Sequence, residues 1–330
     1  MNNHGLTSLT LLIGLLLCLP MVGQADPIPS SENWVIVLHD NTPKRLQGWQ
    51  SLGYSSKGHY SQDLFFKRLG RTIAKEYDLE ISDQWYISSL SVYCLIVRPA
   101  NSDALAQLNE DKRVKWVQLG NEFTPLNSLA ATASSATPAP TNKHFSTQSL
   151  PEGATGRGVR IAVVDTAVDQ SHPDLKSSVV LFKDFVSPRQ PRSQAESHGT
   201  AVAGTIAADR NPQLGTQGVA PEASLLGLRA CWEVSDGTSV CDTLSLARAL
   251  DAAVELNTQI VNLSLSGPQD RLLDALVSRL THQGTVVVAA HDPSRDARNR
   301  FPSRQDGVIV VAAKQDPSAD SASALQSSTF

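Results

Sequence analysis

The chain has 330 residues, of which 41% are hydrophobic and 18% are charged. This length is enough for about two domains, each with its own core. The net charge of −4 and the sequence pI of about 6.1 give no electrostatic attraction for nucleic acid, so we expect no nucleic-acid partner. The Lys and Arg residues are scattered along the sequence and form no basic arm.

The first 25 residues predict a signal peptide. Residues 6–22, "LTSLTLLIGLLLCLPMV", are almost wholly apolar, and the small residues Gly23 and Ala25 stand where a signal peptidase cutting after Ala25 would require them. An uncleaved anchor is the alternative, but the stretch is short for a membrane span. We therefore expect a secreted or periplasmic protein that has no membrane contact once the signal is cleaved.

Export would place the remaining cysteines in an oxidising compartment. Cys231 and Cys241 bracket the turn-rich stretch "CWEVSDGTSVC", which predicts a disulfide, with two unrelated thiols as the alternative. Cys94 lies in an apolar run, where we expect an unpaired, buried thiol.

Residues 33–125 predict a small α+β domain. Strand-like runs, "NWVIVLHD", "QWYISSL", "VYCLIVRP" and "VKWVQLGNEF", alternate with helical patterns that start at residues 61 and 102. The order β-α-β-β-α-β is ferredoxin-like, and "VKWVQLGNEF" is expected to close it as one strand. Residues 126–153 are rich in Ala, Ser, Thr and Pro and predict a linker.

The segment from residue 154 to 330 predicts an α/β domain with a doubly wound parallel sheet. Six short apolar runs are typical of strands buried on both faces: "VRIAVVD", "SVVLFKDF", "SLLGLRAC", "QIVNLSLS", "TVVVAA" and "GVIVVAA". Helical stretches lie between them at residues 198–208, 243–256 and 270–283. Strands and helices in alternation indicate helices on both faces of one sheet.

Asp165 and His198 are the first candidates for chemistry. Asp165 ends the apolar run "IAVVD", at the strand edge where α/β folds bind ligands, although an Asp there can also simply cap the next turn. His198 opens "SHGTAVAGTIAA", a helix of small residues that can approach the sheet closely. The helix dipole disfavours a cation at this end, so we expect a mostly neutral imidazole, as a general base requires. Taken alone, each residue is also compatible with a structural role.

Four motifs in order resemble the subtilisin-like family of serine proteases, peptidase S8. They are "GRGVRIAVVDTAVDQSHPDL", "SHGTAVAGTIAA", "GVAPEASLLGLRA" and "IVNLSLSGP", within residues 156–313. The resemblance implies a subtilisin-like fold and a serine endopeptidase with an Asp-His-Ser triad. For residues 33–125 it implies an inhibitory propeptide, and hence an exported zymogen, which we expect to be a monomer.

The resemblance also implies roles for single residues. Asp165 would orient His198, which would take a proton from the nucleophile and return it to the leaving amine. Ser264, Leu265 and Ser266 would line the cleft and pair with a polypeptide substrate or with the chain's own prodomain. The family usually has Gly in place of Ser266, so the wall of the S1 pocket is altered.

No cofactor is expected. Asp174, in "HPDL", could ligate calcium in some members of the family, but one carboxylate gives calcium no support.

Two departures from the family pattern bear on catalysis. Where the family has Ala-Ala-Gly-Asn, this chain has Ala-Ala-His291-Asp292, and an ionised Asp292 cannot donate to an oxyanion as the Asn does. A protonated Asp292 or a neighbouring donor could replace it. The family's Gly-Thr-Ser-x-Ala segment is also absent from the 330 residues. The last serines, at positions 321, 323, 327 and 328, lack the Gly and the small-residue helix of that segment.

Three hypotheses follow. The first is a secreted serine endopeptidase whose Ser segment is missing by truncation, so that these residues alone are inactive. The second is a natural non-catalytic pseudopeptidase, or an inhibitor or folding aid that acts through its prodomain. The third is an unrelated α/β binding protein.

Overall fold

The computed structural model describes residues 33–40, 55–99, 102–126, 153–186, 190, 196–210, 217–234, 238–293 and 299–312. The predicted signal peptide, nearly all of the predicted linker and the last four serines lie outside the described residues.

The N-terminal unit has the predicted β-α-β-β-α-β order. Its elements are β1 (Trp34–His39), α2 (Ser55–Glu76), β2 (Leu79–Ile87), β3 (Val92–Pro99), α3 (Ser102–Glu110) and β4 (Val114–Leu119). The four strands form an antiparallel sheet in the order β2-β3-β1-β4. Ile36 and Leu38 face the core under α2, whereas Val35 and Val37, one residue out of phase, face the C-terminal part. The sheet is therefore buried on both faces.

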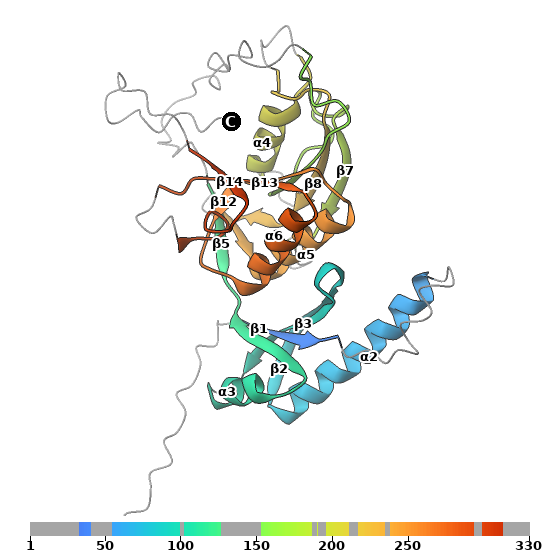
Figure 1. Cartoon of the computed structure of the whole chain (residues 1–330), viewed down its shortest axis with the longest axis vertical. Coiled ribbons are helices and arrows are strands. Elements are labelled where there is room, and N and C mark those ends of the chain that lie inside the picture. The colour runs from blue at the N-terminus through green and yellow to red at the C-terminus, as the bar shows by residue number, and fades with distance from the viewer. Residues whose placement is uncertain are drawn as a thin grey trace, which may run out of the picture.

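One predicted element of this unit is wrong. The run "VKWVQLGNEF" is not one strand, because β4 ends at Leu119 and a new strand, β5 (Glu122–Pro125), starts after Gly120 and Asn121. The backbone N–H of Gly120 donates to the carbonyl of Asn33, and a side chain at Gly120 would press on that carbonyl. β5 leaves the sheet of the N-terminal unit and joins strands of the C-terminal part (Figure 1).

The C-terminal part is built on a six-stranded parallel sheet in the order β14-β13-β11-β6-β8-β7. Its strands are β6 (Arg160–Asp165), β7 (Val179–Asp184), β8 (Ser224–Arg229), β11 (Ile260–Leu263), β13 (Val286–Ala290) and β14 (Val308–Val311). After β6 the chain builds β7 and β8 on one side, and then β11, β13 and β14 on the other. The carboxyl end of β6 is therefore the topological switch point, where open α/β sheets bind ligands.

Helices cover both faces of this sheet. On one face Ile161 and Val163 pack with Ala203 and Ala207 of α4 (His198–Ala207). On the other face, the alternate residues Ala162 and Val164 belong to the core of α5 (Thr243–Glu255) and α6 (Arg271–His282). This arrangement confirms the predicted doubly wound α/β fold.

The N-terminal unit packs on α5 and α6, as Figure 1 shows. The turn between β2 and β3 directs the backbone N–H groups of Ser88 and Ser89 at the carboxylate of Asp251 on α5, at 3.1 and 2.9 Å. At the end of β4, the Gln118 side chain donates to Asp270, the N-cap of α6, at 2.7 Å. These contacts, with the shared apolar core, fix where β5 enters the C-terminal part.

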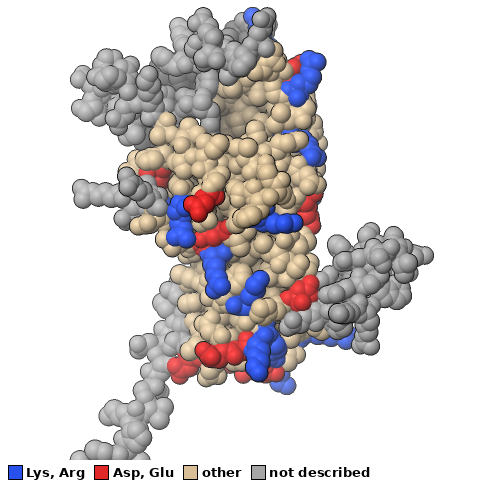
Figure 2. Space-filling view, viewed as in Figure 1, with Lys and Arg blue, Asp and Glu red and all other residues tan. Residues whose placement is uncertain are grey.

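On the face shown in Figure 2, basic and acidic side chains are interspersed and form no large patch of one sign. Within the described residues, no helix is both long and apolar enough to span a bilayer.

Candidate active site

Asp165 and His198, which are 33 residues apart in sequence, meet at the switch point of the sheet. Nδ1 of His198 lies 2.6 Å from Oδ1 of Asp165. Because an ionised carboxylate only accepts hydrogen bonds, Nδ1 carries the proton, and in the neutral imidazole Nε2 is left as the acceptor. The Asp165 side chain is 1% exposed and that of His198 15%. The sequence prediction that these two residues act together thus corresponds to a direct contact.

The backbone around the pair holds it in place. The N–H of Thr166 donates to Oδ1 of Asp165 at 2.6 Å, and the hydroxyl of Thr166 accepts from the N–H of Gly199 at 2.9 Å. A side chain at Gly199 would overlap the Thr166 carbonyl, so only glycine allows this close approach. The small residues that open α4 therefore let the imidazole reach the strand end.

The environment of His198 acts on the pKa of its ring in both directions. Burial by itself lowers the pKa of His198, but attraction to Asp165, their hydrogen bond and a hydrogen bond to the backbone of Leu126 outweigh it and raise the pKa above its ordinary value. The expectation of a mostly neutral ring, which considered only the helix dipole, thus left out the effect of the nearby carboxylate.

An extended segment of the chain itself lies beside this pair. β5 lies between β10 (Ser239–Asp242) and β12 (Leu265–Ser266) and is antiparallel to both. The pairing continues past β5, where the N–H of Leu126 donates to the carbonyl of Ser264 at 2.8 Å. Ser264, Leu265 and Ser266 therefore pair with an extended segment through their backbone, and their role in a substrate cleft stays a prediction.

Phe123 anchors β5 in the cleft. Its side chain is 1% exposed and meets Phe301 edge to face, with ring centroids 5.5 Å apart. Any side chain at Gly267 would overlap the Phe123 ring. The absence of a side chain at position 267 thus leaves the space that the ring fills.

Ser266 and Asp292 form a second buried cluster, with Arg300. The Ser266 hydroxyl donates to Oδ2 of Asp292 at 2.5 Å, and Nε of Arg300 lies 2.8 Å from the same oxygen. Nε of Arg300 also lies 2.9 Å from the Ser266 hydroxyl. Oδ2 of Asp292 thus accepts a hydrogen bond from the Ser266 hydroxyl and is paired with a guanidinium.

Cys231 and Cys241 are joined in a disulfide, with an S–S distance of 2.02 Å, across the antiparallel pair β9 (Cys231–Glu233) and β10. Cys94 is a buried free thiol, and burial raises its pKa far above the usual range. In the part of the chain that the structure describes, no three His, Cys, Asp or Glu side chains, those around Asp174 included, cluster as metal ligands would.

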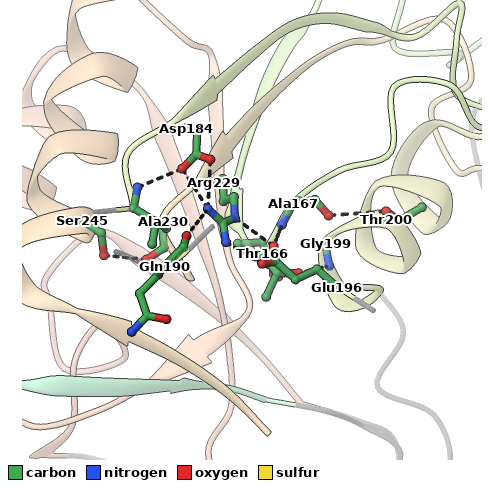
Figure 3. A network of polar contacts seen from close by, with 12 residues as sticks. Thr166, Ala167, Asp184, Gln190, Glu196, Gly199, Thr200, Arg229, Ala230 and Ser245 are labelled. Carbon is green, nitrogen blue, oxygen red and sulfur yellow. Dashed lines mark hydrogen bonds and ion pairs between the residues drawn. The ribbon is translucent and has the colours of Figure 1, made fainter. Parts of the chain in front are cut away.

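Figure 3 shows a polar network that the sequence did not predict, around Arg229, which stands beside Asp165 in the sheet register. Arg229, at the end of β8, is 1% exposed and pairs with Glu196 on one side and with Asp184 on the other. Two signals could have revealed it. Arg229 ends an otherwise apolar strand, and Glu196 stands two residues before His198.

Comparison with known proteins gives a consistent result. A model of the subtilase family, Peptidase_S8, matches residues 156–329, more than half of the chain. Thermitase from Thermoactinomyces vulgaris is 34% identical over 160 residues, which cover 48% of this chain and 56% of thermitase. Subtilisin E from Bacillus subtilis is 36% identical over 168 residues, 49% of this chain and 42% of that protein. An alkaline protease from Alkalihalobacillus alcalophilus is 30% identical over 243 residues, 73% of this chain and 59% of the protease.

Among solved structures, fervidolysin from Fervidobacterium pennivorans, described as a keratinolytic enzyme related to subtilisin, has the same fold. The TM-score is 0.56 at 18% identity, and the match covers 86% of this chain and 43% of fervidolysin. The chain spans about half the length of the curated relatives it matches. On the family match and these relatives, the chain belongs to the subtilase family of serine proteases.

Proposed function

We propose that this chain is the N-terminal portion of an exported serine endopeptidase made as a zymogen, with Asp165 and His198 as two members of its catalytic triad. The observation that carries the proposal is the 2.6 Å contact between them at the switch point of the sheet, beside a peptide segment that fills the cleft. Asp165 fixes the tautomer of His198 and stabilises the imidazolium that forms when Nε2 takes a proton.

The third member would be a serine hydroxyl from a Gly-Thr-Ser-x-Ala segment, which the 330 residues do not contain. His198 would take the proton of that hydroxyl as its oxygen attacks the peptide carbonyl, and would return the proton to the leaving amine. Without the serine no acyl-enzyme forms, and in subtilisin the loss of the serine alone lowers kcat by about 10⁶.

The segment in the cleft suggests the substrate class. The backbone of Leu126 pairs with Ser264 and is hydrogen bonded to His198, which supports a cleavage site after Leu126. Phe123, three residues earlier, is only 1% exposed. We therefore propose an extended polypeptide substrate with an aromatic residue three positions before the cleaved residue, and the prodomain as its intramolecular competitor.

Asp292 favours the second candidate, a non-catalytic pseudopeptidase. Its carboxylate is held by Arg300 and Ser266, so it cannot donate a hydrogen bond to an oxyanion in this arrangement. In that case the N-terminal unit would act as an inhibitor or folding aid for another protease of the family.

Reading the DNA beyond the codon for Phe330 separates the two candidates. A Gly-Thr-Ser-x-Ala segment followed by an apolar helix supports the endopeptidase, and we refer to the product of that reading frame as the extended chain. The extended chain should react with a fluorophosphonate probe and cleave casein, and His198→Ala should abolish both. The 330-residue chain should do neither. Unrelated sequence in all three frames would favour the pseudopeptidase, and labelling of the 330-residue chain would show a nucleophile elsewhere.

A further inference from the structure

Three parallel strands end level with one another behind the Asp165–His198 pair. In the sheet register Asp165 of β6 stands beside Arg229 of β8, and Arg229 stands beside Asp184 of β7. The guanidinium of Arg229 is enclosed, whereas the Asp184 side chain is 39% exposed. The buried guanidinium and the candidate catalytic carboxylate therefore belong to residues that are direct partners on neighbouring strands.

Glu196 connects this cation to the chain on either side of the site. Its Oε2 accepts from Nε of Arg229 at 2.8 Å and from the backbone N–H of Ala167 at 2.9 Å, and its Oε1 lies 2.5 Å from Nη2 of Arg229. The Glu196 side chain is completely buried. Ala167 follows Asp165 by two residues and Glu196 precedes His198 by two, so this single carboxylate ties together the two segments that carry the pair (Figure 3).

Other side chains also hold the start of α4. Its N-cap residue, Ser197, makes no side-chain capping bond. Besides the His198–Asp165 contact, its described side-chain hydrogen bonds include those of Thr166 with Gly199 and of Thr200 with the backbone of Ala167 and Asp169. Glu196 is the charged member of this set, and hydrogen bonds to charged groups are about twice as strong as those between neutral groups.

Stability alone does not account for such a cluster. Moving a charged pair out of water costs several kcal/mol per ion, and apolar residues of the same volume are often at least as stabilising. An apolar pair makes no directional hydrogen bonds. A carboxylate can accept from a guanidinium and from a particular backbone N–H at the same time. Catalytic side chains must be placed to within less than an ångström, and directional hydrogen bonds can provide such placement.

We propose that Glu196 and Arg229 are positioning residues, which hold the entry of α4 so that the His198 imidazole meets Asp165 at hydrogen-bond distance. The proposal rests on the proposed function only in that it concerns the same Asp–His pair. Asp184 supplies charge to the outer side of Arg229 but contacts neither Ala167 nor the segment at 196–198, so it serves as a matched control.

The test uses the full 330-residue chain and no catalysis. With ¹⁵N-labelled histidine, NMR should show a low-field proton on Nδ1 of His198, assigned by its loss in His198→Ala. Glu196→Gln replaces one carboxylate oxygen by a donor, so it should move this resonance upfield or lose it to exchange with water. Hydrogen exchange at the Ala167 N–H should accelerate by on the order of tenfold or more. Arg229→Lys, which keeps the charge but not the fork, should act in the same direction, and Asp184→Asn should leave both readouts near wild type.

Several outcomes would overturn the proposal. Wild-type values of the resonance and of Ala167 exchange in Glu196→Gln would do so, as would equal effects of Asp184→Asn and Glu196→Gln, since the effect would then be one of general charge. If Glu196→Gln does not fold, Glu196→Asp keeps the charge with a shorter reach, and an unchanged resonance there would also refute it. A wild-type chain without the low-field proton contradicts the Asp–His pair itself and this proposal with it, whereas an inactive extended chain contradicts only the proposed function.

Discussion

The backbone N–H of Leu126 donates to the carbonyl oxygen of Ser264 at 2.8 Å, and the backbone of Leu126 is also hydrogen bonded to His198. The last described residue of the N-terminal segment is thus joined both to the cleft wall and to the candidate general base. An inhibitor domain that merely covered the cleft would need neither contact. Both contacts support the proposed cleavage after Leu126.

Processing of the extended chain is therefore expected between Leu126 and Asn127. Leu126→Asp would place a charge where an apolar side chain now sits, and should slow processing by on the order of tenfold or more. N-terminal sequencing and intact mass of the product give the cut site. Leu64→Asp, on the exposed face of α2, is the matched control and should process normally. A cut elsewhere in both variants and wild type would contradict the register.

Substitutions at Phe123 and Gly267 should have non-additive effects on stability. Phe123→Ala removes a buried ring, which typically costs about 3 to 5 kcal/mol, and Gly267→Ala should displace the same ring by overlap. Either change should speed hydrogen exchange of the β5 amides, and the double variant should add little to the larger single effect. Thr124→Ala, on the exposed side of β5, is the control. Additive effects of the two changes would show that they act at separate places.

The disulfide between Cys231 and Cys241 should form in protein prepared without reductant. It closes a loop with a sequence separation of 10, for which the chain-entropy model gives roughly 2 to 3 kcal/mol. The Cys231→Ala, Cys241→Ala double variant should be less stable by about that amount in denaturant titrations. Peptide mapping should recover the two cysteines linked and Cys94 as a free thiol. Recovery of all three as free thiols would refute the pairing.

His198 should make stability depend on pH with a defined sign. Its pKa is higher in the folded chain than the ordinary 6.5, so the folded state binds the proton more tightly. The stabilisation is fully present below about pH 6.5 and is lost as the pH rises through the folded pKa. The free energy of unfolding should fall over that interval in the wild type, but not in His198→Ala or Asp165→Asn. Parallel curves for all three would contradict the assignment.

The sheet and its helices could be predicted because burial leaves a strong mark on sequence. Runs such as "IAVVD" and "VVVAA" are apolar on both faces, and the small residues after His198 show how closely α4 must approach β6. Placing Asp165 and His198 together needed the resemblance as well, since the sequence alone left each open to a structural role.

The strand β5 could not be predicted in the same way. Its partners, Cys241 and Leu265, are more than a hundred residues away, and its own pattern continues that of β4. Gly120 and Asn121 mark the break, but nothing local tells which sheet the next residues join. Arg229 could not be predicted for a related reason. A charged side chain is normally exposed, and Arg229 is buried only because Asp184 and Glu196, which are distant in sequence, both pair with it.

The chain that continues from Leu126 to the C-terminal part also determines how the pairing of β5 with β10 and β12 depends on protein concentration. While the chain is continuous, β5 and the strands that it pairs with belong to one molecule. The effective concentration of β5 at those strands is then of millimolar order or above and does not change on dilution. A cut after Leu126 makes the same association bimolecular. After such a cut, a low protein concentration would favour dissociation of β5, and a high protein concentration would favour its binding.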